Sequence, residues 1–216
     1  MSESIGAEHA FHDAAFAAGW AERFVPTPER LQLFATIHDE LMRCIPRARC
    51  IVELGIGPGY LAEYLLDRNG DAQYLGIDFS APMLEIARQR LHRFLPRVRL
   101  VTADLVAPEW WAEIPAPVDA IVSTWALHDL GSQEDIAAVY ADCMRLLRNG
   151  GLLLNGDFIK PDNTRYEYEP GRFEISKHLE LLRSVGFAEA QCLVLLEHEI
   201  EAPTAAQNYA CFKAVV

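Results

Sequence analysis

The sequence predicts an α/β fold built on a doubly wound, mostly parallel sheet. Short apolar strands alternate with amphipathic helices through residues 50–185, and this alternation is typical of right-handed βαβ units. The first strand runs into a segment with three glycines, and an aspartate follows each of the next two strands. Ligands of such sheets bind beyond the carboxyl ends of the strands. We therefore expect a ligand site at the ends of the first three strands.

Composition narrows the class of protein. The chain has 216 residues, of which 51% are hydrophobic and 23% charged, so we expect one globular domain with a sizeable core. The formal net charge is −12, and no basic patch stands out, which argues against nucleic acid as a partner. No apolar run approaches the ~20 residues that span a bilayer, and no leader pattern opens the chain. We expect a cytoplasmic protein with no membrane partner.

The five cysteines are scattered and form no CxxC pair. We expect them to be small apolar core residues in a reducing compartment. Their spacing also disfavours zinc, so no metal site is predicted.

Two helices are expected before the first strand. Residues 8–20 are rich in alanine and aromatic residues, and Gly19 is expected to end this first helix. Thr27 and Pro28 supply an N-cap and a first helical residue for the second helix, which Pro46 stops. Its predicted apolar face consists of Leu31, Phe34, Ile37, Leu41 and Ile45. We expect residues 1–47 to form a helical cap and residues 48–216 to form the main domain.

The remaining elements follow from apolar runs and capping residues. After the strand that ends near residue 54, strands are expected at 73–78, 97–102, 118–123, 152–157, 190–197 and 208–215. Helices are expected at 61–67, after the cap Ser80, after the capping box at 132–135, and at 175–185. Asn149 and Gly150 are expected to close the third of these helices.

The glycine-rich segment carries the first functional prediction. Gly55, Gly57 and Gly59 permit positive φ and a close approach of a ligand to the backbone, and the amides of the next helix point into the same space. Asp78, 23 residues after Gly55, is placed to accept the two hydroxyls of a ribose. Both NAD and S-adenosylmethionine carry such a ribose.

The spacing of the glycines separates these two cofactors. Dinucleotide-binding loops have the pattern G-x-G-x-x-G, whereas this loop reads G-x-G-x-G, with Tyr60 where the third dinucleotide glycine would be. Glu53 would repel a pyrophosphate but would attract an ammonium or sulfonium group. The residues therefore favour S-adenosylmethionine, which leaves S-adenosylhomocysteine as the product.

Several motifs together resemble the class I S-adenosylmethionine-dependent methyltransferases, in particular small-molecule enzymes of the ubiquinone/menaquinone-biosynthesis type. The matching segments lie at residues 53–59, 76–83, 102–105, 123–130, 145–154 and 181–187. The resemblance implies a Rossmann-like sheet of seven strands in the order 3-2-1-4-5-7-6, with the last strand antiparallel. It also implies a small-molecule methyl acceptor and a monomer or homodimer.

The resemblance further implies a role for each motif residue. The methionine part of the cofactor would be lined by Glu53, Gly55, Ile56, Gly57 and Gly59. Asp78 would bind the ribose, while Phe79 and Met83 would pack on the adenine. Asp104 and the Leu105 amide would hydrogen-bond the adenine, and Thr124 would lie beside the sulfonium.

The catalytic prediction is His128. Methyl transfer from a sulfonium is an in-line displacement in which alignment supplies much of the rate, and a general base is needed only when the acceptor is protonated, as a hydroxyl is. Related sequences often carry His-His here, but this chain has Asp129 as the second residue. Asp129 and Asp157 only weakly suggest a Mg²⁺ site.

The acceptor is expected to lie among aromatic side chains. The candidates are Phe11, Trp20, Phe24, Trp125, Tyr166 and Tyr168. Two other functions remain open at this point: an NAD-dependent oxidoreductase and a non-catalytic scaffold that binds S-adenosylmethionine.

Overall fold

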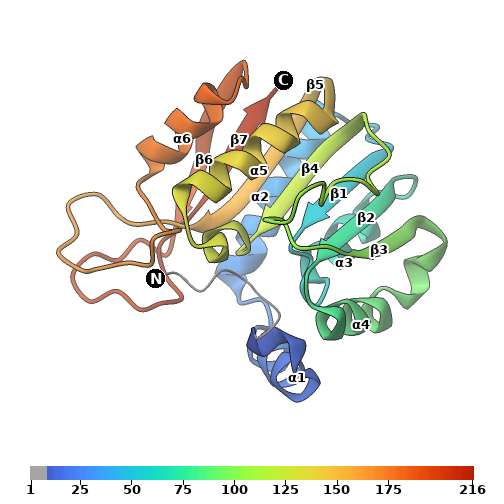
Figure 1. Ribbon diagram of the computed structural model, residues 1–216, viewed down its shortest axis with the longest axis horizontal. Coiled ribbons are helices and arrows are strands. Elements are labelled where there is room, and N and C mark those ends of the chain that lie inside the picture. The colour runs from blue at the N-terminus through green and yellow to red at the C-terminus, as the bar shows by residue number, and fades with distance from the viewer. Residues whose placement is uncertain (1–8) are drawn as a thin grey trace.

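The computed structural model describes residues 9–216 and shows a central sheet with helices on both faces (Figure 1). The prediction that no leader opens the chain, and the first residue of the helix expected at 8–20, lie outside these residues. The strands are β1 (Cys50–Leu54), β2 (Gln73–Asp78), β3 (Val98–Thr102), β4 (Val118–Thr124), β5 (Leu147–Phe158), β6 (Glu189–Leu196) and β7 (Tyr209–Val215).

The strands form one seven-stranded sheet in the order β3-β2-β1-β4-β5-β7-β6. Strand β7 runs antiparallel to its neighbours β5 and β6, and the β1–β5 pairings are parallel. The predicted order and the antiparallel last strand are confirmed. The carboxyl ends of β1, β2, β4 and β5 therefore meet along one edge of the sheet, where the site lies.

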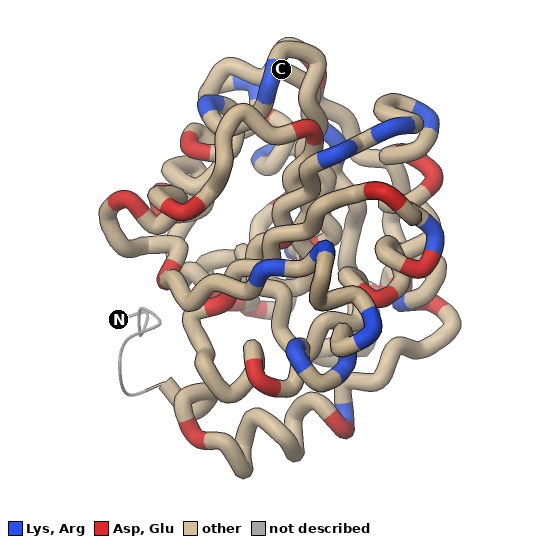
Figure 2. Tube along the Cα trace, turned by 90° about the vertical axis from the view of Figure 1, so that its right-hand side faces the viewer, with Lys and Arg blue, Asp and Glu red and all other residues tan. Residues whose placement is uncertain are grey.

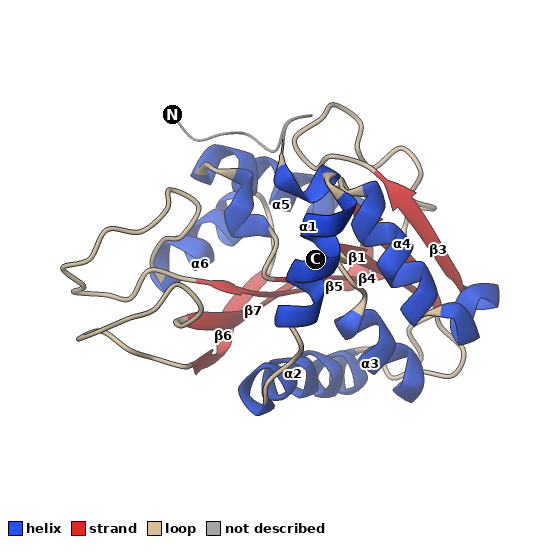
Figure 3. Ribbon diagram, turned by 90° about the horizontal axis from the view of Figure 1, so that it is seen from below, coloured by secondary structure: helices blue, strands red, loops and turns tan. Residues whose placement is uncertain are grey.

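Helices lie on both faces of the sheet (Figure 3), and their apolar side chains form a separate core cluster on each face. One face is covered by α2 (Pro28–Cys44), α3 (Tyr60–Arg68) and α4 (Ala81–Arg90). The other is covered by α5 (Gln133–Leu146) and α6 (Ile175–Ser184). Within the segment 1–47, α2 thus belongs to a layer of the sandwich. The short η1 (Ala10–His12) and α1 (Ala14–Arg23) lie beyond the edge of the sheet (Figure 1).

The first helix differs from its prediction. It is N-capped by Asp13 and continues through Gly19 to Arg23, so Gly19 does not end it. A glycine inside a helix costs roughly 1 kcal/mol relative to alanine. Here Ala17 and Ala21 are buried on the inner face of α1, and this packing outweighs the local preference of Gly19.

The second helix is capped by Thr27 with Pro28 at its first position, as predicted, but one residue of the predicted apolar face is wrong. Leu31 is exposed, and Leu33 is buried in its place.

The end of α5 is also corrected. The helix stops at Leu146, and residues 147–150 already belong to β5, so Asn149 and Gly150 do not close it. Two contacts explain the difference. Leu147 pairs with Val118 of β4, and Arg148 Nε donates to Asp119 Oδ1 at 2.6 Å. Pairing with the neighbouring strand therefore replaces the last helical turn.

The described residues carry charges of both signs. Acidic and basic positions are interspersed over much of the trace (Figure 2). Within residues 9–216, no helix combines the length and the apolar character that crossing a bilayer requires.

Candidate functional site

The glycine loop turns sharply between β1 and α3. Gly55, Gly57 and Gly59 have φ of 64°, 50° and 82°, a region that favours glycine. Ile56 N donates to Ile77 O at 2.9 Å, which fixes the loop to the end of β2. A Cβ on Gly57 would meet no atom within 4 Å, so this residue faces open space.

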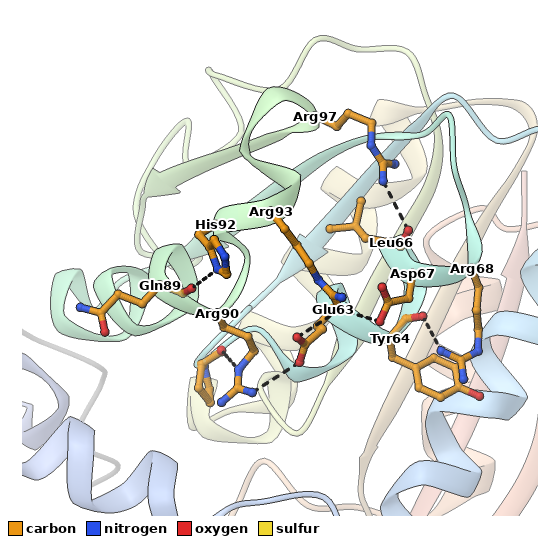
Figure 4. A network of polar contacts seen from close by, with 11 residues as sticks. Glu63, Tyr64, Leu66, Asp67, Arg68, Gln89, Arg90, His92, Arg93 and Arg97 are labelled. Carbon is orange, nitrogen blue, oxygen red and sulfur yellow. Dashed lines mark hydrogen bonds and ion pairs between the residues drawn. The ribbon is translucent and has the colours of Figure 1, made fainter.

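Polar contacts of α4 and the residues that follow it stabilise the glycine loop and α3 (Figure 4). Arg90 Nε donates to Pro58 O at 2.8 Å, and its guanidinium lies 3.7 Å from the ring centroid of Tyr60. Arg90 also pairs with Glu63 at 3.4 Å, and Arg93 pairs with Asp67 at 2.8 Å. The Arg90 contacts tie α4 to α3 and to the glycine loop, and Arg93, in the short helix η2 (His92–Arg97) that follows α4, adds a second tie to α3.

Glu53 is buried at the end of β1, where it accepts a hydrogen bond of 2.6 Å from the Tyr74 hydroxyl. Burial raises the pKa of Glu53 to about 8, and the negative charge of Asp78 adds to the shift, against the opposing effect of the Tyr74 hydrogen bond. No cation pairs with Glu53 among the described residues. A ligand ammonium group would satisfy this carboxylate.

Asp78 lies at the end of β2, directly across from the loop. Its two oxygens accept hydrogen bonds from Gly57 N at 2.8 Å and Ser80 N at 2.9 Å. Burial raises the pKa of Asp78 to about 6, while these amides favour the charged form. Each carboxylate oxygen keeps a further lone pair, so Asp78 can also accept hydroxyl donors.

One cavity of about 460 Å³ runs along this edge of the sheet. Its size lies in the range typical of small-molecule sites. The structure brings eleven of the twelve predicted site residues to its wall: Glu53, Gly55, Ile56, Gly57, Asp78, Phe79, Met83, Asp104, Leu105, Thr124 and His128. Their predicted roles toward a cofactor or acceptor remain predictions.

Gly59 is the exception, because it does not line the cavity. It is the N-cap residue of α3, and a Cβ there would meet Ala87 and Leu91 at 3.4 Å. The close approach of α3 and α4 therefore accounts for this glycine without a ligand contact.

His128 is held at the opposite side of the cavity by Asp157. The residue lies in the short helix η3 (Leu127–Leu130) after β4. Its Nδ1 is 2.7 Å from Asp157 Oδ1, and its backbone N donates to Asp157 Oδ2 at 3.0 Å. Its Nε2 lies 3.2 Å from Asp129 Oδ1.

The surroundings of His128 act on its charge in opposite directions. Burial lowers the pKa of His128, but Asp157 and Asp129 raise it, and the net pKa lies above the ordinary value of 6.5. Burial raises the pKa of Asp157, yet the His128 contact brings it below 3.8. Asp157 thus stays ionised and accepts the Nδ1 proton, while Nε2 faces Asp129 Oδ1 on the cavity wall.

Sequence reasoning did not identify Asp157 as the partner of His128. The residues are 29 positions apart and meet only because β4 and β5 are neighbours in the sheet. A carboxylate at the end of β5, beside a histidine after β4, is the signal that could have found the pair.

Gly171 is a second residue that the sequence did not single out. A Cβ there would lie 1.8 Å from the carbonyl oxygen of His128, so the chain after the polar loop packs directly on the backbone of η3. Only glycine permits this approach.

Gly171→Ala is therefore expected to shift η3 and His128. We predict a destabilisation of about 1–3 kcal/mol, the usual cost of overpacking, measured by thermal melting. Gly70→Ala is the matched control, because a Cβ at Gly70 meets nothing within 4 Å. Equal behaviour of the two variants would contradict the packing role.

The predicted aromatic residues separate into two groups. Phe11, Trp20, Phe24 and Trp125 line the cavity, whereas Tyr166 and Tyr168 do not. Phe34 and Phe158 line the cavity as well and were not predicted as site residues. Trp125 adopts φ of 49° at the end of β4, an uncommon conformation for a bulky residue, and its backbone N donates to Gly156 O at 2.8 Å.

The residues at the glycine-loop end fit an adenosyl cofactor. Glu53 offers a buried carboxylate to a cation, Asp78 offers acceptors to hydroxyls, and Gly57 leaves backbone open to the cavity. Phe79 and Met83 provide the apolar surface that an adenine would need.

Sequence comparisons point to methyl transfer. Residues 51–151 match the family described as "Methyltransferase domain". A trans-aconitate 2-methyltransferase of Azoarcus sp. (strain BH72) is 40% identical over 106 residues, which cover 49% of this chain and 38% of that protein. An uncharacterized methyltransferase of Geobacillus sp. (strain WCH70) is 32% identical over 140 residues, covering 64% of this chain and 62% of that protein. The chain thus matches less than two thirds of the length of either relative.

Solved structures show the same fold. An O-methyltransferase family protein from Burkholderia thailandensis superposes with a TM-score of 0.69 at 15% identity, covering 94% of this chain and 60% of that one. The magnesium protoporphyrin IX methyltransferase of Synechocystis PCC 6803, solved with S-adenosylmethionine, gives a TM-score of 0.68 at 17% identity and covers 95% of this chain and 92% of that one. At these identities the likeness concerns the fold alone.

Proposed function

We infer from these comparisons that the chain is a class I S-adenosylmethionine-dependent methyltransferase, and we propose that it methylates an oxygen atom of a small-molecule acceptor. The observation that carries the choice of oxygen is the His128–Asp157 pair on the cavity wall. A hydroxyl acceptor needs a base, and a buried histidine whose Nδ1 is held by a carboxylate provides one at Nε2.

In this proposal the two ends of the cavity have different tasks. Glu53 would bind the ammonium group of the cofactor, Asp78 its ribose hydroxyls, and Asp104 with the Leu105 amide its adenine. When bound, the cofactor supplies a methyl group on a positively charged sulfur. Thr124 would lie beside that sulfur, the aromatic walls would position the acceptor, and His128 Nε2 would take the acceptor's hydroxyl proton.

Asp157 would fix the tautomer of His128 and stabilise the imidazolium that forms. Asp129 lies within hydrogen-bond reach of Nε2. The acceptor hydroxyl would therefore have to take the place of Asp129 at that nitrogen.

We infer that the cap over the cavity consists of η1 and α1, a smaller unit than residues 1–47. Phe11 and Trp20 from these elements line the cavity, and the Ser80 hydroxyl donates to Phe11 O at 2.5 Å. The core packing of α2 supports counting that helix with the main domain.

The test is methyl transfer from labelled S-adenosylmethionine to a panel of phenols, hydroxy acids, thiols and amines. Product formation with oxygen acceptors, lost in His128→Ala, supports the proposal. Methylation confined to sulfur, nitrogen or carbon, or full activity of His128→Ala, contradicts it. The comparisons do not favour an NAD-dependent oxidoreductase or a scaffold, and calorimetry with NAD and S-adenosylmethionine checks this directly. The monomeric or homodimeric state and the cytoplasmic location stay predictions, for light scattering and cell fractionation to check.

A further inference from the structure

Arg30 brings a buried positive charge to the acceptor end of the cavity. It lies in the first turn of α2 and lines the cavity with only 9% of its surface exposed. Its guanidinium carbon lies 3.7 Å from the ring centroid of Phe24 and 5.6 Å from that of Trp125. The aromatic rings hold the guanidinium in place by cation–π contact.

This guanidinium lacks a partner among residues 9–216. None of the ion pairs of the described residues, within 4.0 Å, involves Arg30, and its side chain donates no hydrogen bond there. Glu197 is the carboxylate that acts on Arg30 from a greater distance, and it accepts a hydrogen bond of 3.0 Å from the Tyr209 hydroxyl.

The other buried cations of the described chain are paired. Arg172 contacts Glu169 at 2.9 Å and Ala205 O at 2.8 Å, and Lys213 contacts Glu40 at 2.9 Å. A buried charge is costly unless it is paired and hydrogen-bonded. Arg30, the buried cation without a partner in the described chain, therefore lies on the cavity wall, where a ligand can supply the partner.

A second unused donor lies beside it. The indole Nε1 of Trp125 is buried and has no hydrogen-bond partner among the described residues. Arg30 and Trp125 thus lie together on the cavity wall, among the rings of Phe24, Phe34 and Phe158.

We propose that Arg30 binds a carboxylate of the methyl acceptor, so that the substrate is a hydroxy acid with an aromatic or other planar body. This rests on the proposed function and narrows its substrate class. The planar guanidinium matches a carboxylate with two parallel hydrogen bonds, and the surrounding rings suit a flat apolar body. Glu53, Asp78, Asp104 and Asp129 also line the cavity, and their charge favours a monoanion over a phosphate ester.

Binding, measured without methyl transfer, tests the proposal. The protein is saturated with S-adenosylhomocysteine and titrated with benzoate, with the neutral analogue benzamide and with phenyl phosphate, each followed by NMR or calorimetry. We expect benzoate to bind at least tenfold more tightly than benzamide, and Arg30→Gln to remove this preference. Arg30→Lys, which keeps the charge but not the fork, should retain part of it.

Arg68→Gln is the matched control, because Arg68 stacks on Tyr64 at 3.6 Å in a similar way but lies outside the cavity. It should keep the full preference for benzoate. Unchanged affinity for S-adenosylhomocysteine shows that the Arg30 variants are folded.

Three results would overturn the proposal: equal binding of benzoate and benzamide, a preference that survives Arg30→Gln, or no binding of any probe. Tighter binding of phenyl phosphate than of benzoate would mean that Arg30 binds a phosphate, which would also overturn the proposed carboxylate. Because the readout is binding, it can succeed or fail independently of the choice of oxygen as the methylated atom.

Discussion

Glu53→Gln should make the empty protein more stable above pH 7 and at the same time weaken its binding of S-adenosylmethionine. The pKa of Glu53 is about 8 in the folded protein and near the ordinary 4.5 when unfolded. Since the folded pKa is the higher one, stability is fully present below pH 4.5 and is lost as the pH rises toward 8. At pH 8 the buried carboxylate costs roughly 4 kcal/mol.

Glutamine removes this charge and can still accept the Tyr74 hydroxyl, although its own amide must be desolvated at a cost of about 1–3 kcal/mol. We expect a net gain of about 1–3 kcal/mol at pH 8, which for a chain of this size raises Tm by roughly 2–10 °C. The gain should be absent near pH 4. Cofactor affinity should fall about 10- to 100-fold, because a charge-assisted hydrogen bond is lost.

Thermal melting of both proteins between pH 4 and 8.5, with and without S-adenosylmethionine, measures the two effects together. Tyr74→Phe is the companion variant, since it removes the neutral partner of Glu53 but keeps the carboxylate. If Glu53→Gln is less stable than the parent protein at pH 8, the buried charge does not destabilise the empty site.

Asp157→Asn and His128→Ala are expected to have the largest effects on turnover. General-base catalysis contributes about 10²–10⁴-fold, so His128→Ala should lower turnover with an oxygen acceptor at least tenfold, and about 100-fold if the base acts in the slow step. In Asp157→Asn the histidine remains, but its orientation and the support for its positive charge are weakened, so turnover should also fall.

The pH profile separates a catalytic effect from a structural one. The base acts when unprotonated, so turnover should rise with pH through the pKa of His128, which Asp157 and Asp129 raise against the effect of burial. In Asp157→Asn the midpoint should move to lower pH while the plateau falls. Asp119→Asn is the control, because Asp119 also accepts two backbone amides, from Arg49 at 2.7 Å and Cys50 at 3.1 Å, and is not part of the cavity wall. A shifted midpoint in that variant, or none in Asp157→Asn, would contradict the assignment.

The sequence predicted the strands and the residues at the glycine-loop end of the cavity, because both depend on local patterns. Strand β2 was placed to the residue, and the caps Thr27, Ser80 and Ser132 follow from side chains that bond their own helix termini. The strand order was implied by the family resemblance, and the observed strand pairings confirm that order. Local rules were wrong at Gly19 and at Asn149–Gly150, where packing against distant elements decides the end of the helix.

The contacts around His128 and Arg30 could not be predicted in the same way. Asp157, at the end of β5, meets His128, which follows the neighbouring strand β4. Gly171 packs on the His128 backbone from the end of a loop that begins more than thirty residues later in the chain. Arg30 carried no signal either, since an arginine in the first turn of an amphipathic helix is usually on the surface. Its burial follows from Phe24 and Trp125, which flank the guanidinium from outside its own helix.

The polar loop before Gly171 is closed at its base, and this sets how such an enzyme can diversify. Lys160 N donates to Phe173 O at 3.2 Å, and Lys160 Nζ pairs with Glu174 at 3.0 Å, so the two ends of the loop are fastened to each other. Residues 161–170 lie outside the cavity wall, and lengthening a loop costs little entropy. Insertions within residues 161–170 are therefore expected to leave the contacts at the base of the loop intact, which makes this loop a natural place to lengthen the chain by evolution or engineering.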